Sequence, residues 1–240
     1  MNYSTGGATG RGFWGMAMNY FAHALPFLDR PYLAAGTGVP DWLTVVDRAV
    51  RLRSKHLEPF LEDSDPVTAA VAAGVGQHIR DDRRFHQSRA FAELSLELTV
   101  AIRDALGADS GFRPSFLGHL LVEVLLDDSL AADDPDGLEE YYRTMDRVDP
   151  EAVQRAVNRM APRPTDRLAR MISGFCRERI LSDYHEDGKL MGRLSQVMRR
   201  VKLPPLPGEF CEILPGFRRL VHARKQELLD GIPVAPDKRK

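Results

Sequence analysis

The sequence predicts an all-α protein, folded as a single orthogonal bundle of helices. Apolar residues recur at spacings of three and four through most segments after residue 18, and proline- or glycine-containing breaks separate those segments. No stretch alternates apolar and polar residues for long enough to indicate a strand. With 240 residues, 43% of them hydrophobic, the chain can build a sizeable core. We expect a flexible extension over residues 1–17 and one helical domain over 18–240.

The expected helices follow from their start and stop signals. A short helix carries His23 and breaks at Pro26, and AAGTGVPDW (34–42) is expected to be a turn that introduces a helix at Pro40. Asp65-Pro66, Ser88 and Pro114 are typical helix starts, and Gly107 is a typical helix end. Further helices are expected over 138–147, 150–160, 165–184, 190–201 and 216–229.

Composition narrows the class of protein. The net charge of -1 gives no argument for nucleic acid, and no run of 18 apolar residues predicts a membrane span. Two cysteines without CxxC spacing argue against a disulfide framework or a cysteine zinc site and fit a reducing, cytoplasmic location.

Charge is divided unevenly along the chain. Residues 1–151 carry 14 basic and 24 acidic side chains, whereas 152–240 carry 19 and 10. This asymmetry indicates either a basic surface for an anionic partner or two parts that neutralise each other in the fold.

The stretch GVGQHIRDDRRFH (74–86) is the first candidate functional motif. In a helix, His78, Asp82 and His86 lie four residues apart and project from one face. A second stripe with the same spacing, formed by His119, Glu123 and Asp127, interrupts the apolar run FLGHLLVEVLLDDSL. Ionisable groups in a core helix need a partner that offsets their desolvation, and a divalent metal is one such partner.

The ligand types define a class of metals. Imidazole and carboxylate together suit manganese, iron or zinc, and carboxylates with water admit magnesium. The alternative is that each stripe is a set of local hydrogen-bonded ion pairs.

Arg80, Arg83 and Arg84 are either solvated or bind a phosphate. His86 or His119 is our candidate for protonating a leaving oxygen.

Several segments resemble the acyl-carrier-protein phosphodiesterase family. MNYFAH (18–23) resembles its MNFLAH opening, GTGVPD (36–41) is similar to its GN-x-x-x-D segment, and the stretch from Gly74 to Asp82 resembles its G[IV]-x-x-H-x-x-x-D. EVLLD (123–127) stands where the family has D-x-x-x-D, and MAPRP (160–164) resembles a later MA-x-R-P stretch. These motifs occur in the family's order between Met18 and Leu229.

The resemblance implies a helical, metal-dependent phosphohydrolase of the HD group that favours manganese. Its substrate would be the phosphodiester that joins 4′-phosphopantetheine to a carrier-protein serine. Carried over by position, the metal ligands would be His23, Asp41, His78, Asp82 and Asp127, with Glu123 close by as a catalytic residue. An acidic acyl carrier protein would then dock on the basic C-terminal part.

The sequence departs from the family pattern in several ways: His119 has no counterpart in it, the chain contains no His-Asp dipeptide, and three positions carry a different residue. Thr37 replaces an asparagine, His86 an acidic residue and Glu123 an aspartate. Two alternatives therefore stay open: a phosphohydrolase acting on a different small phosphoester, and a non-catalytic helical binding protein.

Overall fold

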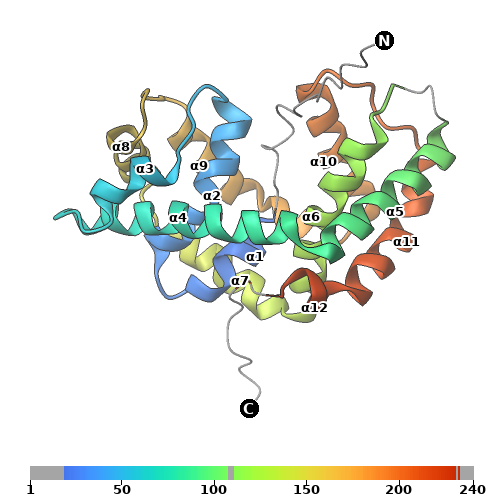
Figure 1. The fold of residues 1–240 in the computed structure, drawn as a ribbon, viewed down its shortest axis with the longest axis horizontal. Coiled ribbons are helices and arrows are strands. Elements are labelled where there is room, and N and C mark those ends of the chain that lie inside the picture. The colour runs from blue at the N-terminus through green and yellow to red at the C-terminus, as the bar shows by residue number, and fades with distance from the viewer. Residues whose placement is uncertain (1–18, 108–110, 231, 233–240) are drawn as a thin grey trace, which may run out of the picture.

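The computed structural model describes residues 19–107, 111–230 and 232, and every regular element in these ranges is helical (Figure 1). The all-α prediction is confirmed; the extension expected over 1–17 lies outside the described residues. The helices are α1 (Tyr20–Ala24), α2 (Pro31–Val46), α3 (Ser54–Leu57), α4 (Pro66–Gln87), α5 (Arg89–Leu106), α6 (Pro114–Asp133), α7 (Pro135–Asp146), α8 (Pro150–Met160), α9 (Leu168–Glu178), α10 (Asp187–Arg200), α11 (Phe210–Ala223) and α12 (Lys225–Leu228). Short 3₁₀ helices cover Leu25–Phe27, Glu58–Phe60 and Ile180–Asp183.

Helix α4, which carries the first motif, and the following helix α5 begin at the predicted capping residues. The Asp65 carboxylate accepts hydrogen bonds from the amides of Val67 and Thr68 at the start of α4. Ser88 caps α5 in the same way, and Gly107 ends that helix with a φ of 80°, a conformation that favours glycine.

The prediction of a turn at 34–42 is wrong, because α2 runs without a break through this segment and ends at Val46. Glycine and proline are poor helix formers, but ten residues of α2 are buried, and this packing outweighs propensity. The hydroxyl of Thr37 also donates to the carbonyl of Ala34.

Two later boundaries also differ from expectation. The helix expected over 165–184 is interrupted at Arg179, whose φ of 46° ends α9. The helix expected over 216–229 begins earlier, at Phe210, and continues through Pro215 before α12 follows.

Helix α4 crosses the molecule and joins its two halves (Figure 1). Helices α2, α3, α8 and α9 lie towards one end of α4, and α5, α6, α10 and α11 lie towards the other. The short helix α1 contacts α2, α4, α6 and α7, so it sits where the halves meet. The two stripes of ionisable residues, on α4 and α6, therefore lie on helices that contact α1 at this junction. Within the described ranges, no helix has the length and apolar character needed to span a membrane.

Candidate metal centre

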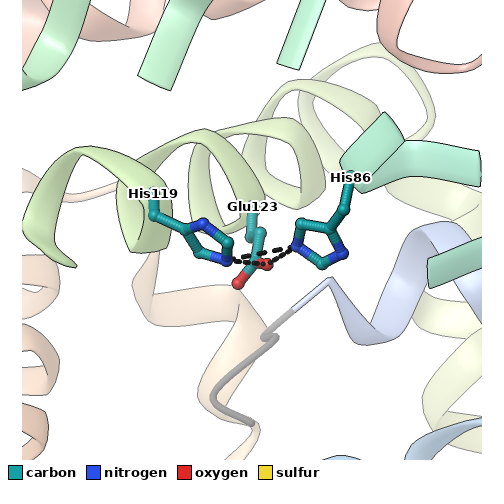
Figure 2. Close-up of side chains that lie close together, drawn as sticks. All are labelled: His86, His119 and Glu123. Atoms are coloured by element: carbon teal, nitrogen blue, oxygen red, sulfur yellow. Dashed lines mark hydrogen bonds and ion pairs between the residues drawn. The ribbon is translucent and has the colours of Figure 1, made fainter. Parts of the chain in front are cut away.

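Three side chains from α4 and α6 converge at the junction, and we call His86, His119 and Glu123 the triad (Figure 2). The Nε2 atoms of His86 and His119 lie 2.9 and 3.2 Å from the same Glu123 oxygen, Oε1. The two Nε2 atoms are 3.1 Å apart. Figure 2 shows the two imidazole rings on either side of the carboxylate. Three potential ligand atoms therefore form a nearly equilateral triangle.

These separations fit ligands of one metal ion. Two adjacent ligands in octahedral coordination, each about 2.1 Å from the ion, lie about 3.0 Å from each other. Two imidazole nitrogens and a carboxylate oxygen suit manganese, iron or zinc. Glu123 is fully buried, whereas the His119 side chain is 29% exposed. Solvent therefore reaches the triad at His119.

Asp82 fixes the orientation of His86. The Nδ1 of His86 lies 3.0 Å from Asp82 Oδ1 and 2.9 Å from the Asp82 carbonyl oxygen. Because Nδ1 has two acceptors, it keeps a proton in every protonation state, and Nε2 is the nitrogen that faces the triad. Burial opposes the charge on His86, but the hydrogen bonds to Asp82 and Glu123 outweigh it and raise its pKa to about 10.

Phe91 supports both imidazoles of the triad from α5. Its ring packs edge-on against His86 and His119, with centroid distances of 4.6 and 4.8 Å. The two imidazoles stack on each other at 4.8 Å with an interplanar angle of 13°. Aromatic packing of this kind restricts the rings to one orientation.

A second polar group, the buried quartet, consists of His23, Asp41, His78 and Asp81. His78 Nε2 lies 3.8 Å from Asp41 Oδ1, and His23 Nδ1 lies 3.8 Å from Asp81 Oδ2. The rings of His23 and His78 are 4.6 Å apart. All four residues are at most 4% exposed. Both 3.8 Å contacts are too long for hydrogen bonds.

Several atoms of the quartet lack hydrogen-bond partners among the described residues. They include both ring nitrogens of His23 and the Oδ2 of Asp41. Burial, followed by repulsion from Asp82 and Glu123, raises the pKa of Asp41 well above its usual range. Burial and the neighbouring His23 lower the pKa of His78 to about 3. Unsatisfied buried polar atoms are destabilising, and a cation or ordered water between them would satisfy them.

One pocket of about 270 Å³ connects the triad and the quartet. Asp41 and His78 of the quartet, His86 and His119 of the triad, and Asp82 between them all line it. Of the predicted ligands, His23 is buried behind this wall, in contact with His78 and Asp81. The structure therefore places Asp41, His78 and Asp82 along one pocket wall. Among the described residues, however, only the triad brings three potential ligand atoms close enough together for one ion.

The contacts of Asp127 give it a structural role. Its two carboxylate oxygens accept hydrogen bonds of 2.9 Å from the amides of Phe21 and Ala22. These amides belong to the first turn of α1, where no intrahelical acceptor exists. Asp127, expected as a metal ligand, thus caps α1 and ties it to α6.

The three arginines expected to bind phosphate do not line the pocket. Arg80, Arg83 and Arg84 are exposed on other faces of α4, and Arg80 donates to Gln77. Arg51 and Arg53, from the segment between α2 and α3, line the pocket instead. Their positions follow from the path of this loop, for which the sequence has no periodic signal.

Asp81 is the other residue that the sequence did not single out. It stands three positions after His78 and faces His23, while its neighbour Asp82 faces His86. The side-chain amide of Gln77 donates to both carboxylate oxygens of Asp81, at 2.8 and 2.9 Å. The Asp81-Asp82 pair could have indicated this in the sequence, because adjacent residues of a helix point about 100° apart and so face different neighbours.

Comparisons with protein-family models, curated proteins and solved structures gave no match for this chain. Membership of the acyl-carrier-protein phosphodiesterase family therefore stays a prediction that rests on the motifs.

Proposed function

We propose that this protein is a metal-dependent phosphohydrolase that acts at the pocket between the triad and the quartet. The observation that carries the proposal is the convergence of three ligand atoms within 3.2 Å of one another beside a pocket with two arginines. A divalent ion held there would act as a Lewis acid on a phosphoryl oxygen and lower the pKa of a bound water.

The side chains of the triad would hold the ion. His86 and His119 were expected to transfer protons, but their Nε2 atoms face Glu123 and each other, which favours a ligand role. Asp41 and His78 offer further ligand atoms on the same pocket wall, where His78 Nε2 and Asp41 Oδ1 lie 3.8 Å apart. Asp82 keeps the His86 proton on Nδ1.

Arg51 and Arg53 would bind the oxygens of the substrate that do not react. Both are exposed, and a guanidinium can form two parallel hydrogen bonds to a phosphate. A His-His-carboxylate group also occurs in non-haem iron oxygenases. The arginines and the additional His-Asp pairs favour the hydrolysis of an anionic ester over an oxygenase reaction.

Metal analysis and turnover together test the proposal. We expect the purified protein to contain manganese, iron or zinc at one ion or more per chain, and Glu123→Gln to lose most of it. The manganese-loaded protein should hydrolyse bis(4-nitrophenyl) phosphate. Protein without bound metal that turns over no phosphoester would refute the proposal and favour the binding-protein alternative.

Substrate identity needs separate measurements. Holo-acyl carrier protein, the substrate implied by the motifs, is compared with small phosphodiesters by mass spectrometry of the released product. Arg51→Gln and Arg53→Gln should raise KM about tenfold without changing metal content. Arg83→Gln, the same substitution on an exposed face of α4, is the matched control and should have no effect.

A further inference from the structure

A second cavity lies between α9 and α10, away from the candidate metal centre. It has a volume of about 840 Å³, and the end of α2 closes it at Val46. None of its lining residues lines the metal pocket. Its size is within the range of small-molecule sites, about 300 to 1,000 Å³. We call it the α9–α10 groove.

The two helices face each other across this groove with polar stripes. Helix α9 contributes Arg170, Ser173 and Arg177, and α10 contributes Arg193, Gln196 and Arg200. Within each stripe the residues are three or four positions apart, as on one face of a helix. The stripes are part of the basic C-terminal part of the sequence, residues 152–240.

Three of these arginines have no acidic or hydrogen-bond partner within the described ranges: Arg170, Arg177 and Arg200. Arg193 differs, because it is held by Glu178 and Asp183 at 2.8 and 2.7 Å. Positive charge in a concave site attracts anions more strongly than the same charge on a flat surface. Two acidic residues, Asp166 and Glu178, also line the groove, but five arginines outnumber them. The net positive charge of the lining therefore indicates an anionic ligand.

The floor of the groove is apolar. Phe175 and Met171 line it, and both also line an extension of about 40 Å³ that is bounded by Tyr20, Val45 and Val197. Gly174, in the middle of α9, leaves the groove open, since a Cβ at this position would meet no atom within 4 Å. A ligand that fits both the rim and the floor has a charged head and an apolar body.

We propose that the α9–α10 groove binds a small amphipathic anion, with its head between the arginines of the two stripes and its apolar part over Phe175. This site is independent of the proposed hydrolase activity, because the two pockets share no residue. A flat basic surface for a large acidic protein would not need the apolar extension.

Calorimetric titration of the full chain with 1-octanesulfonate tests the proposal. This probe has an anionic head and an apolar chain, and it contains no phosphoester that a phosphohydrolase could cleave. We expect saturable binding of one molecule per chain. Methanesulfonate, which lacks the chain, and 1-octanol, which lacks the charge, should each bind at least about tenfold more weakly.

Two kinds of variant locate the binding. Gly174→Met should obstruct the groove and weaken binding, whereas Gly216→Met, at a glycine of α11 that also has open space, should leave binding unchanged. Arg170→Gln with Arg177→Gln should weaken binding about tenfold or more, and Arg103→Gln on α5 should not. Circular dichroism should show the same helix content in every variant.

Three results would overturn the proposal. The first is no saturable binding of octanesulfonate, and the second is binding that survives both Gly174→Met and the double arginine change. The third is self-association that Gly174→Met abolishes while octanesulfonate does not bind, which would mean that a second copy of the chain fills the groove. None of these depends on metal content or turnover.

Discussion

Gly36 and Gly74 meet backbone to backbone where α2 crosses α4. A Cβ on Gly74 would lie 2.8 Å from the Gly36 Cα and 2.2 Å from the carbonyl oxygen of Leu33. Gly36 comes five residues before Asp41 and Gly74 four before His78, so this crossing sets how closely these two side chains approach across the quartet.

Gly74→Ala should therefore lower the stability of the protein and change the geometry of the quartet. The added methyl has no room beside backbone atoms, so the helices must separate, and we expect a loss of about 1 to 3 kcal/mol in the free energy of unfolding. Urea denaturation measures it. Gly76→Ala is the matched control in the same helix, because its Cβ would come no closer than 3.5 Å to another residue. Equal stability of the two variants would contradict the close crossing.

Asp82→Asn should weaken metal binding without removing a triad ligand. An amide at this position is a poorer acceptor for the His86 Nδ1 proton, so His86 loses orientation and basicity; such changes typically lower affinity about 10- to 100-fold. Competition with a chromogenic chelator gives the dissociation constant. Asp104→Asn, on an exposed part of α5, serves as the control. A complete loss of metal in Asp82→Asn would instead indicate that Asp82 is itself a ligand.

Metal affinity should rise with pH. His86 has a pKa of about 10 in the metal-free protein, raised by Asp82 and Glu123 against the effect of burial. Below that pKa, an ion that binds Nε2 must displace a proton, so the apparent affinity falls as pH decreases. From pH 8 to pH 6, we expect a decrease of about 100-fold from this group alone. Calorimetry in buffers of different ionisation enthalpy should show proton release, and an affinity independent of pH would exclude His86 as a ligand.

Asp127→Asn should lower stability and leave metal content unchanged. The substituted amide nitrogen would face the Phe21 or Ala22 amide, and one donor in the first turn of α1 would lose its acceptor. Leaving such a group unpaired costs about 1 to 3 kcal/mol. Thermal unfolding and metal analysis of the same preparation distinguish a structural role of Asp127 from a role as a metal ligand. A loss of metal at unchanged stability would restore Asp127 to the ligand set.

The sequence by itself determined the helical class, most helix starts and the two stripes of ionisable residues. These features depend on local chemistry: capping side chains act within one turn, and a spacing of four fixes the face of a helix. His78, Asp82 and His86 could therefore be placed on one face of α4, and His119 and Glu123 on one face of α6.

Only the tertiary structure decided how these side chains pair. Whether His86 contacts Glu123 depends on how α4 packs against α6, and this packing involves residues 37 positions apart. Other tertiary contacts turned Asp127 towards the amides of α1 and placed Asp81 beside His23. The path of the segment between α2 and α3 made Arg51 and Arg53 the arginines of the pocket. Burial of α2 against α4 also kept its glycines and proline helical against their local preference. Contacts of this kind are non-local, so no spacing within the chain encodes them directly.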